Sequence, residues 1–198
     1  MLVTEEESSV NVMFRGEQIS LRPFEAEDAP GLEVYLNHPD LAGRRYIPDG
    51  LPDVLPLARG QVSEVVQRWQ QADKELHLAV VQVSKGELVG HVSADWGWDP
   101  HNPSVSVVID PAQQRHGYGS TALRLVLRYL FERTPAHCVT AWIDGWNEAG
   151  LAFAEQLGFH HAGQMRRVGL RGGEFYDVVV VDLLRPEWKG RGGEGDVA

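Results

Sequence analysis

The chain has 198 residues, of which 43% are hydrophobic and 23% are charged, and these ordinary proportions exclude disorder as the main state of the protein. Its formal net charge is −10, from 18 basic and 28 acidic residues, so it lacks the basic surface that nucleic-acid binding requires. The apolar runs are much shorter than the roughly 20 residues of a membrane span, and we expect no contact with a membrane.

The N-terminus shows no signal peptide, and Cys138 is the single cysteine, so we expect a cytoplasmic protein without disulfides. We expect one domain over residues 13–188 with a flexible tail at each end. The first tail, residues 1–12, is acidic, and the second, residues 189–198, contains four glycines and no apolar pattern. Nothing between the tails is typical of a linker or of a repeat.

The first half of the chain predicts one strand, two helices and a hairpin. Alternating apolar and polar residues indicate strands, and helical spacing indicates helices. We expect a strand over 18–22, helices over 25–36 and 61–71, and strands over 76–83 and 88–95 joined by a turn at Lys85 and Gly86. Residues 37–59 contain four prolines and predict a long loop, a kind of segment that often carries function.

The second half alternates strands with helices. Residues 105–109 form a nearly continuous apolar run, which is typical of a strand near the centre of a sheet. We then expect a helix over 120–132, a strand over 139–143, a helix over 148–157 that ends at Gly158, and a final strand over 178–184. Hairpins combined with crossover helices predict an α/β (α+β) fold, in which a mixed sheet has helices on both faces.

The segment between residues 105–109 and the strongest helix is the most informative one. It reads Gln114, Arg115, His116, Gly117, Tyr118, Gly119, Ser120. Two glycines spaced by one residue allow a tight turn and let an anion approach the backbone. The unpaired N–H groups of the following helix would point at that anion, and Arg115 adds a positive charge. A diphosphate fits this chemistry without a metal; the alternative is a plain turn in which the glycines serve only the backbone.

Two motifs resemble those of the GNAT superfamily of N-acetyltransferases. Gln114, Gly117 and Gly119 match its acetyl-CoA loop, Q/R-x-x-G-x-G/A. About thirty residues later, Asn147 opens a helix that ends in Leu-Gly-Phe at residues 157–159, which resembles the second signature of the superfamily. Residues 19–23 resemble its first strand. Residues 184–188 resemble the end of the branch that acetylates ribosomal-protein N-termini, the RimJ/RimL-like branch.

This resemblance implies a mostly antiparallel sheet of roughly seven strands, splayed at its centre between the strands at Val105 and Val139, with acetyl-CoA held in the split. It implies cofactor contacts from the backbone of the strand and from the loop, in the order Val107, Val108, Ile109, Gln114, Arg115, His116, Gly117, Tyr118, Gly119 and Ser120. Asn147 matches an asparagine that contacts the cofactor. An ordinary helix N-cap is the compatible alternative for Asn147.

The positions at which relatives carry acid–base residues hold Ser104, Trp142 and Ala154, so neither the general base nor the general acid is assigned. Asp95 is the candidate catalytic residue, because Trp96 and Trp98 beside it would raise its pKa by desolvation. The alternative is a solvated loop carboxylate. Two further aspartates, Asp144 and Asp177, are expected to be structural. His91 is interpreted as a buried histidine rather than a base, and Cys138 as an inert thiol. No metal site is expected.

We therefore expect an acetyl-CoA-dependent N-acetyltransferase that moves the acetyl group directly to a primary amine. The acceptor is a protein or peptide N-terminal amine or a small-molecule amine. The alternative is a regulatory module that binds acyl-CoA without turnover, which the missing acid–base residues leave open. The sequence also leaves open a homodimer, the identity of the acceptor and the use of other acyl groups.

Overall fold

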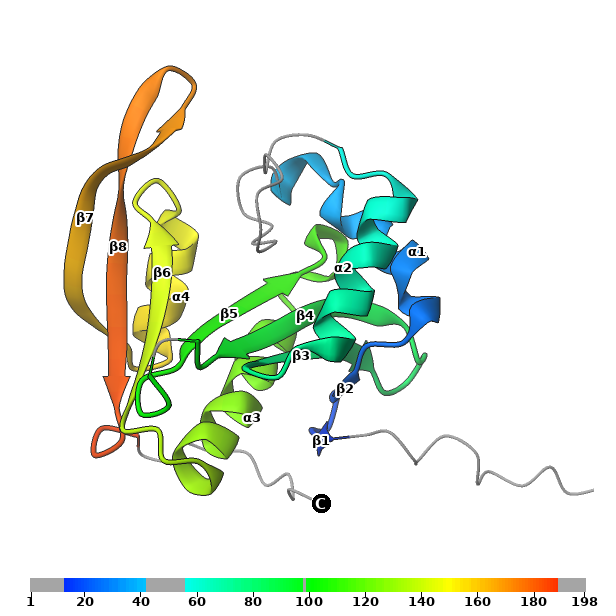
Figure 1. Cartoon of the computed structure of the whole chain (residues 1–198), viewed down its shortest axis with the longest axis horizontal. Coiled ribbons are helices and arrows are strands. Elements are labelled where there is room, and N and C mark those ends of the chain that lie inside the picture. The colour runs from blue at the N-terminus through cyan, green and yellow to red at the C-terminus, as the bar shows by residue number, and fades with distance from the viewer. Residues whose placement is uncertain (1–12, 42–55, 98, 189–198) are drawn as a thin grey trace, which may run out of the picture. The chain divides into compact units, whose positions relative to one another are not determined.

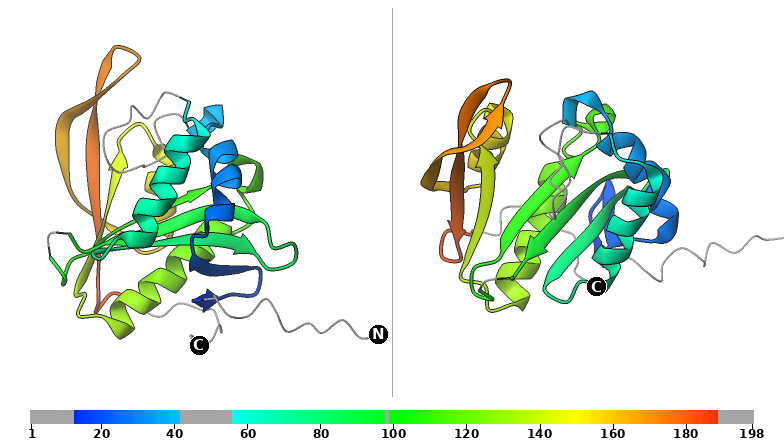
Figure 2. Two further views of the ribbon diagram at one scale, coloured as in Figure 1. Left: turned by 45° about the vertical axis from the view of Figure 1, so that its right-hand side comes forward. Right: turned by 45° about the horizontal axis from the view of Figure 1, so that its top comes forward.

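The computed structural model describes residues 13–41, 56–97 and 99–188 (Figures 1 and 2). Both predicted tails, residues 1–12 and 189–198, lie outside the described residues, as do residues 42–55 of the predicted long loop and Trp98. The expectations for these segments stay predictions.

The described chain contains eight strands and four α-helices. The strands are β1 (Phe14–Arg15), β2 (Ile19–Pro23), β3 (Glu75–Gln82), β4 (Leu88–Asp95), β5 (Ser104–Ile109), β6 (Cys138–Asp144), β7 (His160–Arg171) and β8 (Glu174–Leu184). The helices are α1 (Ala29–Leu36), α2 (Arg59–Gln71), α3 (Tyr118–Arg133) and α4 (Glu148–Gln156), with short 3-10 turns at Ala26–Asp28, Pro39–Leu41 and Pro111–Gln113. Among the described residues, no helix is long and apolar enough to cross a membrane.

The strands form one mixed sheet in the order β1-β2-β3-β4-β5-β6-β8-β7. Strands β5 and β6 are parallel, with Ser104 opposite Thr140, whereas β2 pairs with β3, and β8 with both β6 and β7, in antiparallel orientation. This mostly antiparallel sheet with helices confirms the predicted fold class. The eighth strand is the two-residue β1, which the sequence did not indicate. The expected splay between β5 and β6 stays a prediction.

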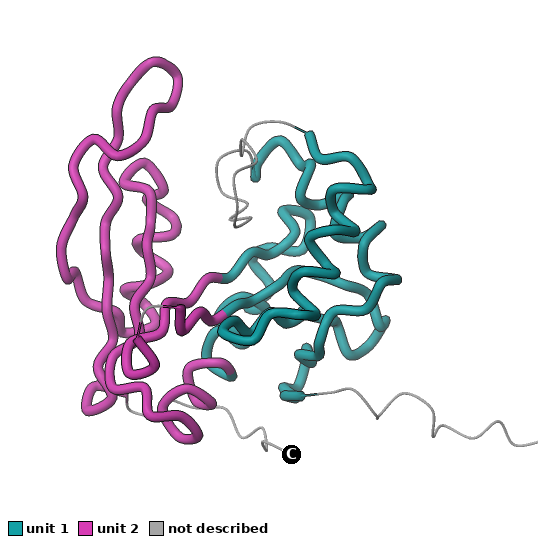
Figure 3. The backbone as a smooth tube through the Cα atoms, in the orientation of Figure 1, with its two compact units in different colours: residues 1–93, 107–125, 193–198 teal, residues 94–106, 126–192 magenta. Residues whose placement is uncertain are grey.

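Contacts between Cα atoms divide the chain into two compact units (Figure 3). Of the described residues, unit 1 comprises 13–41, 56–93 and 107–125, and unit 2 comprises 94–97, 99–106 and 126–188. Strand β5 and helix α3 contribute residues to both units. The expectation of a single domain over residues 13–188 stays a prediction.

In unit 1, helices α1 and α2 cover one face of the strands and the first half of α3 lies on the other face (Figure 2). The residues of β3 alternate accordingly: Ala79 and Val81 belong to the core cluster under α1 and α2, whereas Leu78 and Val80 are buried on the opposite face. The cluster consists of Phe24, Ala29, Leu32, Tyr35, Leu36, Leu41, Leu57, Val62, Val65, Val66, Trp69, Ala79, Val81 and Val108.

Two helix starts differ from the sequence prediction for local reasons. The expected helix over 25–36 is divided into a 3-10 turn and α1, because Pro30 lies in the first turn of α1, where its missing N–H costs nothing. Arg22 of β2 forms two hydrogen bonds of 2.7 Å to the Asp28 carboxylate, which ties this turn to the sheet. Helix α2 begins at Arg59 because the Gln61 side chain accepts the Ala58 N–H at 2.9 Å and caps the helix earlier than its apolar pattern indicates.

In unit 2, helix α4 packs on one face of β6 and β8, where Val139, Val181 and Leu183 are buried. The predicted end of the helix at Gly158 is confirmed. Gly158 has φ +93°, and the N–H groups of Gly158 and Phe159 donate to Glu155 and Ala154 at 2.9 and 3.1 Å, which is a Schellman motif.

The side chain of His91 is deeply buried in unit 1, at 2% exposure. His91 of β4 lies among the rings of Phe24, Tyr35 and Trp69, and its Nδ1 is 2.8 Å from the Tyr35 hydroxyl. Burial, and secondarily the charge of nearby His77, lowers the pKa of His91 from 6.5 to about 3. The interpretation of His91 as a buried histidine is confirmed.

This pKa predicts acid sensitivity. Between pH 6.5 and about pH 3 the unfolded chain binds a proton at residue 91 that the folded chain excludes, so stability must fall as the pH falls through this window. For each pH unit by which the pH is lowered in that window, we expect the free energy of unfolding of His91→Phe to fall by up to about 1.4 kcal/mol less than that of the wild type. Urea unfolding at several pH values measures the difference.

The exposed His161→Phe variant serves as a control and should keep the wild-type slope. Equal slopes for wild type and His91→Phe would show that His91 is protonated in the folded state and would contradict the prediction.

Candidate functional site

The chain leaves β5 through a capped turn. The Asp110 carboxylate accepts the Ala112 N–H at 3.0 Å, and Gln114 folds back so that its Nε2 donates to the Ile109 carbonyl at 3.1 Å. The Asp110 N–H donates to the Val89 carbonyl at 2.9 Å, which attaches the end of β5 to β4. These bonds fix the direction in which the loop starts.

The loop itself contains two residues in the left-handed region of backbone space. Arg115 has φ +67° and Gly117 has φ +81°. Glycine adopts this conformation freely, whereas for a residue with a Cβ it costs of order 1–3 kcal/mol. Arg115 and Arg167 are the non-glycine residues with positive φ among the described residues. Strain of this kind is concentrated at functional sites, and the prediction that this loop binds a ligand gains support from it.

Helix α3 begins directly after these residues. The Thr121 N–H and the Ser120 hydroxyl both donate to the Gly117 carbonyl, at 3.0 and 2.9 Å. The N–H groups of Tyr118, Gly119 and Ser120 precede the first helical hydrogen bond, so they have no acceptor within the helix. They form the positive end of a helix of 16 residues, which suits an anion.

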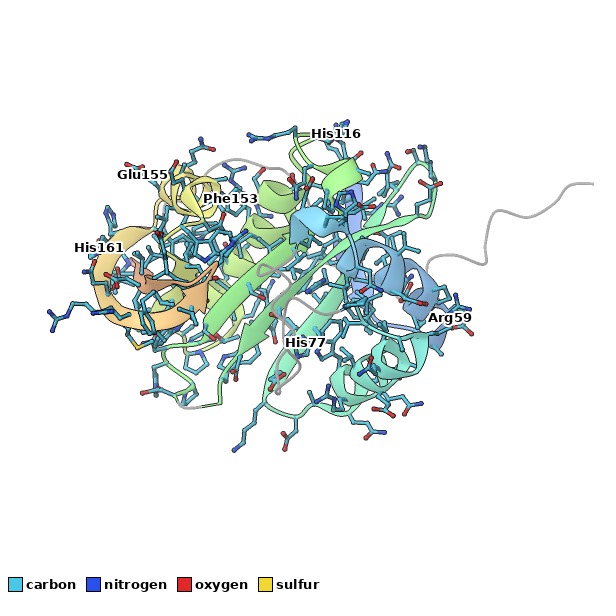
Figure 4. All side chains as sticks on the ribbon, turned by 90° about the horizontal axis from the view of Figure 1, so that it is seen from above. Arg59, His77, His116, Phe153, Glu155 and His161 are labelled. Carbon is cyan, nitrogen blue, oxygen red and sulfur yellow. The ribbon has the colours of Figure 1, made fainter. Side chains whose placement is uncertain are left out.

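A residue that the sequence did not indicate holds this helix start in place. Gln82, at the end of β3, donates from Nε2 to the Tyr118 hydroxyl at 2.9 Å, and the His116 ring stacks on Tyr118 with centroids 5.5 Å apart. Figure 4 shows His116 at the outer edge of unit 1, beside the start of α3. Because Gln82 and Tyr118 are 36 positions apart in the chain, their hydrogen bond is a tertiary contact, and no local sequence pattern predicts it.

The strand residues expected to contact the cofactor lie in the same unit as the loop. Val108 is buried, whereas Val107 and Ile109 are half-buried. Strand β4 approaches this segment closely, because a Cβ on Gly90 would lie 2.3 Å from the Val108 carbonyl oxygen. The structure therefore brings residues 107–109 and 114–120 together in unit 1.

Asn147 belongs to unit 2 and has the geometry of a helix cap. Its side-chain oxygen accepts the Gly150 N–H at 3.2 Å, and its own N–H donates to the Asp144 carbonyl at 2.8 Å. A Cβ on Gly150 would lie 2.5 Å from Asn147 Nδ2, so the amide rests directly on that glycine. The N-cap interpretation of Asn147 is confirmed, and its contact with a cofactor stays a prediction.

Asp95, the candidate catalytic residue, also lies in unit 2 and is engaged locally. Its Oδ1 accepts the Gly97 N–H at 2.5 Å, which is the geometry of an Asx turn at the end of β4. This bond favours the alternative of a loop carboxylate, and the catalytic role stays a prediction. Asp177 is structural as expected, because its carboxylate accepts the Arg167 N–H at 2.7 Å and its carbonyl accepts the Gly145 N–H at 2.7 Å.

The positions at which relatives carry acid–base residues hold no acid–base side chain in this chain. Ser104 lies opposite Thr140 at the parallel pair, Trp142 is exposed on β6, and Ala154 is buried in α4. Burial, followed by the charges of Asp182 and Glu187, raises the pKa of Cys138, which disfavours a thiolate. No group of three or more potential metal ligands occurs among residues 13–41, 56–97 and 99–188.

Comparison with solved structures supports the fold. An acetyltransferase of the GNAT family from Bacillus anthracis superimposes with a TM-score of 0.75 at 22% identity, over 88% of this chain and 99% of that one. A spermidine N-acetyltransferase from Vibrio cholerae, solved in complex with CoA and spermine, superimposes with a TM-score of 0.73 at 17% identity, over 86% and 98% of the two chains.

Sequence comparison identifies the family. A probable N-acetyltransferase of Bacillus subtilis, YjcK, is 25% identical over 186 residues, covering 88% of this chain and 98% of the relative. An L-methionine sulfoximine/L-methionine sulfone acetyltransferase of Salmonella typhimurium is 31% identical over 126 residues, covering 60% of this chain and 72% of the relative. The profile of the Acetyltransferase (GNAT) domain matches residues 18–160. Since this match spans most of the chain, the protein belongs to the GNAT family of acetyltransferases, enzymes that transfer the acetyl group of acetyl-CoA to an amine.

Proposed function

We propose that acetyl-CoA binds along β5 and in the loop before α3, and that its acetyl group passes directly to a primary amine of low pKa. The observation that carries the cofactor site is the pair of left-handed residues, Arg115 and Gly117, immediately before the N-terminus of a 16-residue helix. Left-handed residues in a turn can orient successive backbone N–H groups to one side, and N–H groups so arranged before a helix bind phosphate groups.

The roles of the residues follow from their places in unit 1. The backbone of Val107, Val108 and Ile109 would pair with the pantetheine arm, and Gln114 would hold the loop on the end of β5. The pyrophosphate would be bound by amides of the loop and the helix start, from Arg115, His116, Gly117, Tyr118, Gly119 and Ser120. Arg115 supplies a local positive charge on a chain whose net charge is −10. Asn147 would add a contact from the start of α4.

Gly119→Glu tests this site. Gly119 is the second residue of α3, where a carboxylate favours the helix but repels a bound phosphate. At about 4 Å and an effective dielectric constant near 20, this repulsion is about 4 kcal/mol. We therefore expect at least a 100-fold loss of acetyl-CoA affinity in calorimetry, and we expect wild-type binding to persist in excess chelator.

Gly60→Glu is the matched control, because Gly60 is the second residue of α2 and a Cβ added there would meet nothing within 4 Å. This variant should bind acetyl-CoA as the wild type does. A folded Gly119→Glu protein with unchanged affinity would contradict the assignment of the loop.

The acceptor is inferred from the missing acid–base residues. Transfer forms a C–N bond, breaks the C–S bond of the thioester and releases one proton from the amine, so the amine must first be neutral. At pH 7 neutralising a lysine amine of pKa about 10.4 costs about 4.6 kcal/mol, whereas an α-amine of pKa near 8 costs about 1.4 kcal/mol. Without a glutamate at Ser104 or Trp142, we propose an α-amine or a similarly acidic amine, with Asp95 as the candidate that accepts the proton, directly or through water.

Two classes of acceptor fit this chemistry. A protein or peptide N-terminus fits the likeness of residues 184–188 to the ribosomal-type, RimJ/RimL-like branch. A small molecule with an α-amine fits the Salmonella relative, which is named for derivatives of an L-amino acid. Both classes occur in the cytoplasm, where we place the protein. Polyamines, named in the Vibrio structure, carry more basic amines, although the acidic chain would attract them.

A pair of peptides distinguishes amine classes. One has a free N-terminus and no lysine, and the other has a blocked N-terminus and several lysines. At pH 7 the neutral fraction of the first amine exceeds that of the second by about 100-fold or more, and we expect a similar ratio in kcat/KM, measured as release of free thiol. For the first peptide, kcat/KM should rise with pH up to the pKa of its N-terminus.

Equal or faster acetylation of the blocked peptide would show that a strong base exists in this site. Binding of acetyl-CoA without thiol release on any amine tested would instead favour the regulatory module that binds acyl-CoA without turnover.

A further inference from the structure

The sheet of unit 2 has one face that α4 covers and one face that is open to solvent. In Figure 1, α4 lies behind β6. Val139 and Leu183, which pair in the register of β6 and β8, are buried on the covered face, as is Val181. Successive residues of a strand lie on opposite faces of the sheet, so Trp142 and its partner Val180 belong to the open face. The Trp142 side chain is 54% exposed.

The strand register arranges the open face in rows that run across the strands. The first row is polar and consists of Ser104, Thr140, Asp182 and His160. The second row is apolar and consists of Trp142, Val180 and Gly163. The third row consists of Asp144, Val178 and Met165. A polar row thus borders an apolar surface, and this arrangement suits a ligand that has a polar group next to an apolar one.

The apolar row contains an open space beside Trp142. A Cβ added on Gly163 would meet nothing within 4 Å, and Val180, between Gly163 and Trp142, is half-buried. An aliphatic group of a ligand can therefore lie on Val180 and Gly163, with the indole of Trp142 on one side. We call this surface the Trp142 face, and it consists of Trp142, Gly163, Met165, Val178 and Val180.

The Trp142 face keeps large apolar side chains in contact with solvent. Met165 is 39% exposed, in addition to Trp142, and Val178 beside it is half-buried. Contiguous exposed apolar side chains mark interaction sites. Methionine adapts its shape to a ligand, whereas the strand backbone below holds Val178 and Val180 in place. The surface is therefore suited to bind an aliphatic side chain.

The charges of the open face restrict the ligand further. Among the residues of β6, β7 and β8 that the register places on this face, the charged or titratable ones near neutral pH are Asp144, Asp182, His160 and the pair of Arg171 and Glu174. Three carboxylates and one guanidinium give a formal charge of −2 when the histidine is neutral. An α-amine of pKa near 8 is mostly protonated at pH 7, so an amine-bearing acceptor is complementary to this charge and an acidic side chain is repelled.

We propose that the Trp142 face binds the side chain next to the reacting amine and selects acceptors in which this side chain is aliphatic. The inference rests on the proposed α-amine acceptor and names its class, of which a peptide with an N-terminal leucine is an example. The aliphatic group lies on Val180 beside Trp142, and the amine lies over the polar row, where the hydroxyls of Ser104 and Thr140 can accept its N–H groups. Ser104 is the first residue of β5, the strand along which we propose that acetyl-CoA binds.

Three peptides that differ only in their first residue, leucine, glycine or aspartate, test the inference. Calorimetry measures their affinities for the full chain saturated with CoA, which carries no acetyl group, so that the complex cannot react. We expect the leucine peptide to bind at least about 10-fold more tightly than the glycine peptide. The aspartate peptide should bind most weakly, and kcat/KM with acetyl-CoA should follow the same order.

Two variants alter the surface in opposite ways. Trp142→Ala removes the indole, and Gly163→Leu fills the space beside it without backbone strain, because Gly163 has no positive φ. Each should lower the ratio of the leucine to the glycine affinity to about 3-fold or less. Phe175→Ala removes an aromatic side chain that is 57% exposed on the other face of β8, and Gln164→Leu adds a leucine on the other face of β7, where Gln164 pairs with Val179. Both controls should keep the wild-type ratio, and thermal unfolding shows that the variants are folded.

Equal affinities of the leucine and glycine peptides for the wild type overturn the inference, as does a wild type that binds none of the peptides. A preference that survives in both Trp142→Ala and Gly163→Leu also overturns it. If the glycine and leucine peptides are acetylated at equal kcat/KM, the inference fails while the proposed function stands. Selective binding of the leucine peptide without release of thiol from acetyl-CoA supports the inference and contradicts the proposed transfer.

Discussion

The position of the candidate site depends on how closely β4 approaches β5. A Cβ on Gly90 would lie 2.3 Å from the Val108 carbonyl oxygen, so any other residue at 90 would push β5 away. The Asp110 N–H bond to Val89, at 2.9 Å, fixes the end of β5 against the same stretch of β4, and the Gln82 bond to Tyr118, at 2.9 Å, fixes the start of α3 against β3. The loop between Asp110 and Tyr118 is thus held at both ends by neighbouring strands. Because both ends of the loop are fixed, Arg115 and Gly117 can keep their left-handed backbone conformations.

Strand β4 also bears on why we propose an acceptor amine of low pKa. His91 follows Gly90 on this strand and turns into the core, where burial holds its pKa at about 3 and the Tyr35 hydroxyl occupies its Nδ1. An imidazole of that pKa is a poor general base at neutral pH. Ser104, Trp142 and Ala154 carry no acid–base group, and Asp95 Oδ1 already accepts the Gly97 N–H. For this reason we propose an acceptor amine of low pKa, with Asp95 as the candidate that accepts its proton.

The sequence predicted the elements whose signals are local and strong. Residues 88–95 were predicted with their observed bounds, because both faces of β4 are buried and its ends carry turn residues. The sequence predicts no strand over β7, because β7 is an exposed edge strand with polar residues, glycines and register shifts near Gly163 and Gly169. At the site, the two glycines indicated the loop, but the left-handed Arg115 and the tertiary bond from Gln82 have no local signal. Asp95 is predicted to be catalytic because tryptophans are its neighbours in the sequence, whereas in the structure its carboxylate accepts the backbone N–H of Gly97, two residues away.

The two non-glycine residues with positive φ in the described chain are both arginines, Arg115 at +67° and Arg167 at +55°. Glycine would fit either backbone with less strain, by an amount of order 1 kcal/mol or more, but glycine would supply no charge. Each arginine is stabilised from outside: the loop of Arg115 is anchored at both ends, and the Arg167 N–H is held at 2.7 Å by Asp177. Arg115 also lies in the loop where we propose that the pyrophosphate of the cofactor binds. The strain retained at Arg115 therefore agrees with a binding function for its charge in the cofactor loop.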